Sequence, residues 1–291
     1  MNSNGVVGLP SPRTYDYNIV CGASKTELPK SFILPDDRLP DITNQHQYNA
    51  CCAFATAEIL QILHRIEFNR DERFSEGFIY GCHRNDEAVY QGMNPDSLLK
   101  FLCKLGSIPK KYYDELYEMP EMRQKLFNNP NFKEFEKLAE KYKLKGYVGF
   151  LRSNYDDMKR ALYEYQYPLF AVSNHGFGCS HAIILIGWDE NGFIIQNSWG
   201  ENWGKGGRKT MSLDTVSYAY LFIDEVLEMK FIDVEKDRWS YDAIKECVFN
   251  GVMKGISETE FAPAQPLTRE QGAQLAVNIF RRVEEIINLN K

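Results

Sequence analysis

The chain has 291 residues, of which 44% are hydrophobic and 13% aromatic, and this is enough to fill a packed core. The formal net charge of −6 and the lack of a basic block argue against nucleic acid as the main partner. No apolar run approaches the roughly 18 residues of a membrane-spanning helix, so no membrane span is predicted. The seven cysteines lack the paired spacing of a zinc site, and neither a metal nor a cofactor is predicted.

The N-terminal segment differs in composition from the rest of the chain. Residues 1–30 are rich in Pro, Gly and Ser and lack periodicity, which predicts an extended arm. The first 18 residues show no basic start followed by an apolar stretch, so no signal peptide is visible.

The first strong helix signal follows two adjacent cysteines in "NQHQYNACCAFAT", residues 44–56. Apolar residues recur at the spacing of a helix buried on one face, at Phe54, Ile59, Ile62, Leu63 and Ile66. Asn49 lies just ahead and is a good N-cap residue. Cys51 and Cys52 are therefore expected in the first turn of a central helix.

Further helices are predicted at 94–105, with Pro95 near its start, around 128–142, and at 154–165. After Pro168 the pattern changes to short apolar runs, which predict strands over 168–174, 181–189 and 192–199. Asn191-Gly192 between two of these runs is a hairpin signal. Helices first and strands later indicate an α+β fold.

A domain boundary is expected near 227–232. Beyond it, one helix is predicted over Ser240–Phe249 and a second from Thr268, where "TREQ" forms a capping box with Gln271. The predicted domains are an arm over 1–30, a main domain over 31–228 and a small all-α domain over 229–291.

The cysteine pair admits three interpretations: a buried pair in a core helix, a metal or disulfide element, or a nucleophile. A thiol nucleophile needs a nearby imidazole and a group that orients the imidazole. The N-terminal end of a helix favours the thiolate, and both Cys51 and Cys52 meet that requirement. His181 opens the most apolar strand, and Asn197 lies 16 residues on, so a hairpin would bring the two side chains together.

Three blocks of the chain resemble the papain-like cysteine proteases, in the same order. "NQHQYNACCAFAT" is similar to that family's Asn-Gln-Gly-x-x-Gly-Ser-Cys-Trp-Ala-Phe-Ala segment, and "SHAIILIGWD" to its His-Ala-hydrophobic strand. "QNSWGENWGKGG" resembles its Asn-Ser-Trp-Gly-x-x-Trp-Gly block nearly residue for residue. The resemblance covers about residues 7–228 and implies a two-lobed fold, with a cleft between a helical lobe and a β-rich lobe.

The resemblance also implies roles for single residues. Cys51 takes the place of the nucleophile, His181 that of the general base and acid, and Asn197 that of the residue that orients His181. Gln45 corresponds to the side-chain donor to the oxyanion, and Trp199 to the indole that covers the His–Asn hydrogen bond.

The register of the first block assigns Cys51, because counting six residues from Gln45 reaches Cys51. Cys52 falls where the family usually has Trp. The segment that builds the family's substrate floor matches poorly here, and Gly92 and Met93 are its candidate substrate contacts.

The C-terminal unit resembles a single S-layer homology domain, through "FIDVEKDRWSYDAI" and "GVMKGISETEFAPAQPLTRE". That resemblance implies an anionic cell-wall polysaccharide as a partner, with Trp239, Thr268 and Arg269 as candidate ligands. The family commonly uses three repeats and this chain has one, so a homo-oligomer formed through this domain is one expectation. The domain implies a cell-surface or secreted protein, whereas the N-terminus leaves a cytoplasmic location open.

The sequence therefore predicts a cysteine endopeptidase that cleaves peptide or protein substrates and is tethered to the cell wall. Two rivals remain at this point. One is a catalytically weakened papain-like fold that acts as a binding module. The other is a transferase or conjugate hydrolase that uses the same residues.

Overall fold

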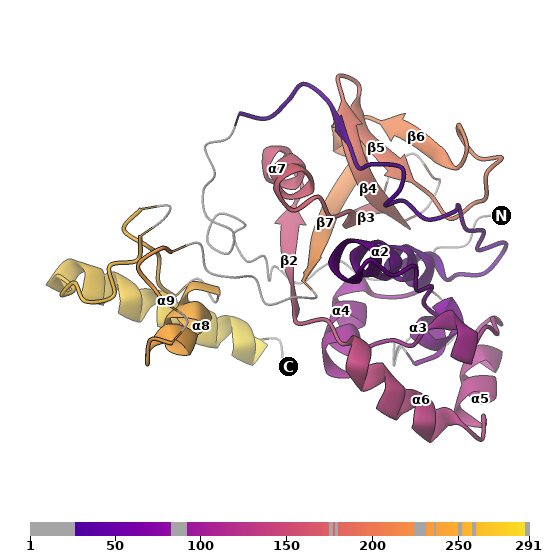
Figure 1. Ribbon diagram of the computed structural model, residues 1–291, viewed down its shortest axis with the longest axis horizontal. Coiled ribbons are helices and arrows are strands. Elements are labelled where there is room, and N and C mark those ends of the chain that lie inside the picture. Colours follow the sequence, from indigo (N-terminus) through magenta and orange to yellow (C-terminus); the bar gives the residue numbers. More distant parts are fainter. Residues whose placement is uncertain are drawn as a thin grey trace. The chain divides into compact units, whose positions relative to one another are not determined.

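The computed structural model describes residues 27–82, 92–174, 177, 180–223, 231–235, 237–249, 252–257 and 260–288 (Figure 1). The chain divides into two compact units, one that contains Leu28–Tyr147 and Leu151–Glu225 and one that contains Val226–Lys291. Most of the predicted N-terminal arm, residues 1–26, lies outside the described residues.

The larger unit combines helices with one sheet, whose strands differ in length. Its helices are α2 (Cys51–Phe68), α3 (Glu76–Cys82), α4 (Pro95–Lys104), α5 (Glu121–Phe127), α6 (Phe132–Ala139) and α7 (Tyr155–Tyr165), with 3-10 turns at Lys110–Tyr112, Glu140–Tyr142 and Leu213–Thr215. Its strands are β1 (Phe32–Ile33), β2 (Gly146–Leu151), β3 (Leu169–Ser173), β4 (His181–Asp189), β5 (Gly192–Gln196), β6 (Arg208–Met211) and β7 (Val216–Ile223). The sheet order is β2-β7-β3-β4-β5-β6, and β1 pairs with β4.

Helix α2 lies between the sheet and helices α3 to α6 (Figure 1). All of its residues from Cys51 to His64 are buried, because one side packs on β3 and β4 and another on α3. A helix that is buried nearly all round holds its N-terminal residues in place with little freedom.

The predicted helices over 94–105 and 154–165 and the three predicted strands are confirmed by α4, α7, β3, β4 and β5. Strand β4 reads as a continuous apolar run because it is buried on both faces: Ala182 and Ile184 belong to the same core cluster as α2, and α7 packs against β4 as well. Strands β1, β2, β6 and β7 were not predicted. β6 is mostly polar, and its pairing with β5 rather than its own pattern makes it a strand.

The predicted N-cap of α2 is wrong. The cap position is Ala50, without a side-chain cap, and Asn49 lies one residue too early, with its backbone N–H donating to the carboxylate of Glu118 at 3.1 Å. By contrast, the side chain of Asn94 caps α4 by accepting from two backbone N–H groups. The uncapped start of α2 leaves backbone N–H groups directed at the region around Cys51.

The predicted hairpin between β4 and β5 is confirmed, with a shift in its turn. Asp189 pairs with Gly192, so Glu190 and Asn191 form the turn and Gly192 already belongs to β5. Gly192 has φ +143°, and a Cβ there would lie 2.0 Å from the carbonyl oxygen of Met211 on β6. Only glycine fits this position, which fixes the register between β5 and its neighbours.

The smaller unit contains α8 (Tyr241–Phe249) and α9 (Arg269–Asn288) and a small core of four buried residues, Val234, Ile244, Val248 and Phe261. The predicted capping box is confirmed: Gln271 N–H donates to Thr268 Oγ1 at 3.1 Å, and Thr268 N–H donates to Gln271 Oε1 at 2.8 Å.

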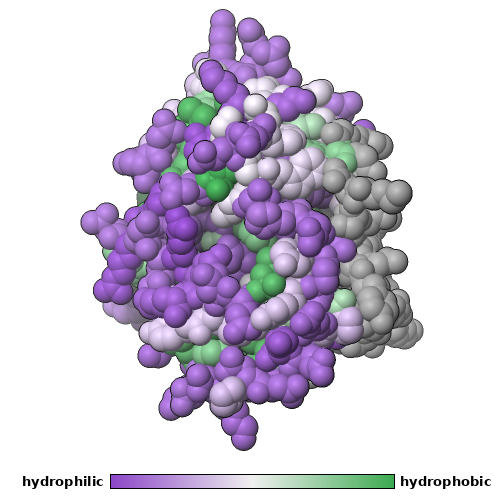
Figure 2. All heavy atoms as spheres, turned by 90° about the vertical axis from the view of Figure 1, so that its right-hand side faces the viewer, coloured by the Kyte–Doolittle hydropathy of each residue, from purple (hydrophilic) through white to green (hydrophobic). Residues whose placement is uncertain are grey.

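On the face drawn in Figure 2, apolar side chains form only small separate areas among hydrophilic ones. Within the described residues, none of the helices combines the length and the apolar content that crossing a bilayer requires.

Candidate active site

Four of the predicted site residues meet in the larger unit. Gln45 lies in the loop before α2, Cys51 is the first residue of α2, His181 opens β4, and Asn197 follows β5. The antiparallel pairing of β4 with β5 returns the chain from His181 to Asn197, as the hairpin predicts. All four side chains are buried, and the exposed fraction of Cys51 is 0%.

The hydrogen bonds around His181 determine its tautomer. Its Nε2 lies 2.7 Å from Asn197 Oδ1. The backbone N–H of Ser198 also donates to Asn197 Oδ1, at 2.9 Å, which fixes the orientation of that amide. Because Oδ1 can only accept, His181 Nε2 must carry a proton, and Nδ1 is left to exchange a proton with another group.

The thiol of Cys51 is surrounded by groups that favour its ionised form. Burial by itself would raise the pKa of Cys51, but a hydrogen bond with Cys52 and the charge of His181 outweigh it. Hydrogen bonds from His181 and from the backbone N–H of Ala182, at 3.5 Å, act in the same direction. Together they lower the pKa of Cys51 well below its ordinary value, which favours the thiolate.

Cys52 is in the opposite state. Burial and the neighbouring Cys51 raise its pKa well above the ordinary value. Its Sγ lies 3.7 Å from the carbonyl oxygen of Met93, and its exposed fraction is 0%. Cys52 therefore stays a protonated thiol, and of the two sulfurs only Cys51 combines ionisation with an imidazole partner.

Gln45 is held by hydrogen bonds of both its side chain and its backbone. Its Nε2 donates to the carbonyl oxygen of Tyr48 at 2.8 Å, and its Oε1 accepts from Ser198 Oγ at 2.7 Å. Its backbone N–H donates to the carbonyl oxygen of Ser198 at 2.8 Å. These bonds fix the amide with Nε2 on the side of Tyr48 and leave one Nε2 proton free to donate elsewhere.

Ser198 was not singled out from the sequence, although it contacts both Asn197 and Gln45. It is buried, with 4% of its surface exposed. It joins the loop before α2 to the segment after β5, and thereby sets the positions of two site residues at once. The signal in the sequence was its place in the Asn-Ser-Trp-Gly block, next to Asn197.

Aromatic rings enclose the imidazole. The ring centroid of Trp199 lies 4.6 Å from that of His181, as expected for an indole that covers the His–Asn hydrogen bond. Phe177 lies 4.9 Å from His181 and stacks on Trp203 at 5.9 Å. Phe177 was missed in the sequence, because it lies in a Gly-rich segment without periodicity. The hydrogen-bonded pair is buried, with 2% of His181 and 1% of Asn197 exposed.

The remaining predicted site residues lie elsewhere or contact the site only indirectly. Gly92 and Met93 are buried just before α4, and Met93 reaches the site through Cys52. In the smaller unit, Trp239 is 93% exposed and Arg269 is exposed, whereas the hydroxyl of Thr268 accepts the cap hydrogen bond. No group of three or more potential metal ligands occurs in the described part of the chain.

A thiolate, an imidazole and an amide held in this order are characteristic of thiol-dependent acyl-transfer enzymes. The family model of the papain family cysteine protease matches residues 28–218, and that of the S-layer homology domain matches residues 230–273. The first match covers well over half of the chain, so the chain belongs to the papain family of cysteine proteases, and an S-layer homology domain follows the protease domain.

Individual relatives agree with both matches. The chain is 47% identical over 53 residues to the Surface-layer 125 kDa protein of Lysinibacillus sphaericus, covering 18% of this chain and 4% of that protein. It is 24% identical over 200 residues to a cysteine protease of Blomia tropicalis, covering 58% of this chain and 56% of that protein. The chain thus spans about half of the length of the cysteine protease and a small part of the surface-layer protein.

Solved structures show the same fold. Xylellain, a cysteine protease from Xylella fastidiosa, superimposes with a TM-score of 0.61 at 20% identity, covering 77% of this chain and 97% of that one. The bromelain protease from Ananas comosus gives a TM-score of 0.55 at 18% identity, covering 68% of this chain and all of that one. The two-lobed papain-like fold expected from the sequence is therefore confirmed.

Proposed function

We propose that the protein is a peptidase that hydrolyses peptide bonds through Cys51, His181, Asn197 and Gln45. The observation that carries this proposal is the 2.7 Å hydrogen bond from His181 Nε2 to Asn197 Oδ1, with the pKa of Cys51 lowered beside it. This arrangement supports an ion pair of thiolate and imidazolium, which is the reactive form of a thiol nucleophile.

Each group has a defined role in the mechanism, and His181 acts first as an acid and then as a base. The Cys51 thiolate attacks the carbonyl carbon of the scissile bond, and the free Nε2 proton of Gln45 and the backbone N–H of Cys51 stabilise the oxyanion. His181 then donates its Nδ1 proton to the leaving amine as the C–N bond breaks. Water, deprotonated by His181, hydrolyses the acyl-enzyme and restores the thiolate.

The proposal is tested by incubating the chain with a peptide library and identifying the products by mass spectrometry. Hydrolysis predicts pairs of fragments whose masses sum to that of the parent peptide plus one water. The two rivals predict different outcomes: a transferase yields peptides joined to an added amine, and a binding module yields no new products. Either of these results would replace the proposed peptidase activity.

Ser198→Ala is expected to lower kcat by about five- to tenfold while KM changes little, because it removes the hydroxyl that orients Gln45. Ser198→Thr keeps a hydroxyl and should recover most of the lost rate. Steady-state kinetics with one peptide substrate measure both values, and thermal unfolding checks the fold. Equal losses in both variants would show that packing, rather than the hydrogen bond to Gln45, is what matters at this position.

The C-terminal domain binds anionic cell-wall polysaccharide and holds the peptidase at the cell surface. The S-layer homology match and the similarity to a surface-layer protein support this part of the proposal. Trp239, which is 93% exposed, offers a ring face to a sugar, and Arg269 offers charge-assisted hydrogen bonds to an acidic group. Thr268 fixes the start of the helix that carries Arg269, and a homo-oligomer would bring several such units together.

Arg269→Ala is expected to weaken sedimentation of the full chain with purified Gram-positive cell wall by about tenfold, because one charged hydrogen-bonding group is lost. Lys254→Ala, which removes another exposed cation of the same unit, is the matched control and should bind like the unchanged chain. If the two variants lose binding equally, the attraction depends on net charge alone, and Arg269 is not a specific ligand.

A further inference from the structure

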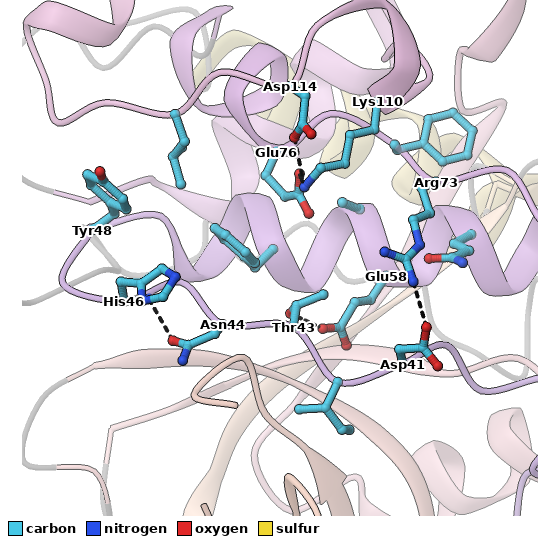
Figure 3. A pocket seen from close by; sticks show the side chains of 16 residues that line it. Asp41, Thr43, Asn44, His46, Tyr48, Glu58, Arg73, Glu76, Lys110 and Asp114 are labelled. Atoms are coloured by element: carbon cyan, nitrogen blue, oxygen red, sulfur yellow. Dashed lines mark hydrogen bonds and ion pairs between the residues drawn. The ribbon is translucent and has the colours of Figure 1, made fainter. Parts of the chain in front are cut away.

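A cavity of about 440 Å³ lies beside α2, on the side of the loop that carries Gln45, and nothing in the proposed mechanism uses it. This volume falls within the range of roughly 300–1,000 Å³ that is typical of ligand sites. One face of α2 forms its floor, through Phe54, Ala57, Glu58 and Gln61. Figure 3 shows α2 crossing the cavity, with Tyr48 and His46 at one end and Arg73 and Asp41 at the other.

The charges that line the cavity do not balance. Two cations, Arg73 and Lys110, meet four carboxylates, those of Asp41, Glu58, Glu76 and Asp114. Both cations are already paired: Arg73 lies 2.6 Å from Asp41, and Lys110 lies 2.8 Å from Glu76 and 3.1 Å from Asp114 (Figure 3). Lys110 is shared by two carboxylates, so the lining holds two negative charges in excess, and among these four carboxylates Glu58 is the one that forms no ion pair with either cation.

Glu58 is buried, with 3% of its surface exposed, and has only neutral hydrogen-bond partners. It accepts from the hydroxyl of Thr43, and from Gln196 Nε2 of β5 at 3.1 Å. Glu76 of α3 also acts on Glu58, and its negative charge repels that of the Glu58 carboxylate. In the described part of the chain, no Lys or Arg forms an ion pair with Glu58.

This environment raises the pKa of Glu58 to about 7, mainly through burial. Ionisation of Glu58 at neutral pH therefore costs free energy in the absence of a counter-charge. A cation entering the cavity would remove that cost, whereas an anion would add to it. The lining also supplies apolar surface from Ile42, Phe54, Phe74 and Leu116, along which an aliphatic stem can lie.

The cavity lies within reach of a peptide bound at Cys51. Glu58 is seven residues after Cys51 on the same helix, which places it about 10 Å further along the axis. An extended peptide covers that distance in about three residues. A side chain two or three positions from the scissile bond can therefore enter the cavity.

We infer that this cavity binds a primary ammonium or guanidinium group on an aliphatic stem, with Glu58 as its counter-charge. As a subsite for a Lys or Arg side chain of the substrate, it rests on the proposed peptidase function. A free alkylamine offers the same chemistry, so the test separates the two sources.

The substrate arm compares peptides that carry Lys or its neutral counterpart norleucine at each of three positions on either side of the cleaved bond. At one position, kcat/KM should favour Lys by about tenfold or more. Glu58→Gln should reduce that ratio to near one, whereas Asp214→Asn, which changes an exposed carboxylate outside the cavity, should leave the ratio unchanged. Ala57→Met, which fills the cavity and leaves Glu58 in place, should also remove the preference.

The binding arm does not depend on activity. n-Butylamine and n-butanol are titrated into the full-length Cys51→Ala chain by calorimetry at pH 7, in two buffers of different ionisation enthalpy. The amine should bind, the alcohol should not, and binding should release up to about half a proton as Glu58 ionises. Glu58→Gln in the same background should lose most of the affinity and all of the proton release.

The substrate experiment and the binding experiment can give negative results independently of each other. Amine binding without a preference for Lys would support the cation site and assign it to a free amine. Amine binding by a chain that cleaves no peptide would contradict the peptidase function and would still support the cation site. No amine binding together with no preference for Lys would overturn the inference, as would binding that Glu58→Gln leaves unchanged.

Discussion

Replacing Cys51 with alanine is expected to lower peptide hydrolysis by on the order of 10⁴-fold or more, because it removes the thiol whose ionised form His181 favours. The same change should abolish the covalent adduct that an epoxysuccinyl peptide forms with the unchanged chain. Intact-protein mass spectrometry measures the adduct, and steady-state kinetics measure the rate.

Cys52→Ala is the matched control, because it removes the adjacent buried thiol. It should keep the adduct. It should slow the reaction only several-fold, since the loss of its hydrogen bond raises the pKa of Cys51 without removing His181. An adduct that persists in Cys51→Ala and disappears in Cys52→Ala would reverse the assignment of the two sulfurs.

His181→Ala is the change with the second-largest expected effect. His181 contributes both charge and a hydrogen bond to the lowered pKa of Cys51, and its removal leaves burial, which raises the pKa, less opposed. The pKa of the thiol should therefore rise, and the thiolate should be scarce at pH 6. If the thiol of the unchanged chain is ionised at pH 6, alkylation of Cys51 by iodoacetamide at that pH should slow by about tenfold for each unit by which the raised pKa exceeds 6.

The same labelling carried out at high pH serves as the control for folding and access. Well above the raised pKa, both proteins carry a thiolate, and the two rates should converge. Peptide hydrolysis should stay low in His181→Ala at every pH, because the proton donor for the leaving amine is absent. A rate of alkylation that does not depend on His181 at pH 6 would contradict the proposed ion pair.

Much of the fold was predictable from local patterns. The helix from Cys51, the capped helix from Pro95 and the strand from His181 are all marked by apolar runs and by the residues at their ends. The capping box of Thr268 and Gln271 is also a local signal, and it forms as predicted. Such patterns are reliable because their cause, backbone hydrogen bonding and burial of one face, acts over a few residues.

Predictions failed where the deciding partner is distant in the sequence. Asn49 is a residue type that caps helices well, yet the helix begins one position later than that, and the backbone N–H of Asn49 donates to Glu118, 69 residues away. β6 has no apolar alternation, and it forms because β5 offers it an edge to pair with. Phe177 carries no periodic signal, and it became visible as part of the site only when its ring lay against that of His181.

The sequence by itself determined which residues are the candidates for chemistry and in what order they occur. Cys51, His181, Asn197 and Gln45 are candidates through the resemblance to the papain-like blocks, and the register of that resemblance, counted from Gln45, favours Cys51 over Cys52. The tertiary structure decided their states: the tautomer of His181, the opposite protonation of the two thiols, and the amide orientations that Ser198 fixes. It also decided the state of Glu58. In the sequence Glu58 is a polar residue within a helical pattern, whereas in the structure it is a buried carboxylate without a counter-charge. Protonation and hydrogen bonding depend on which groups converge in space and on how far water is excluded, and residue order alone specifies neither.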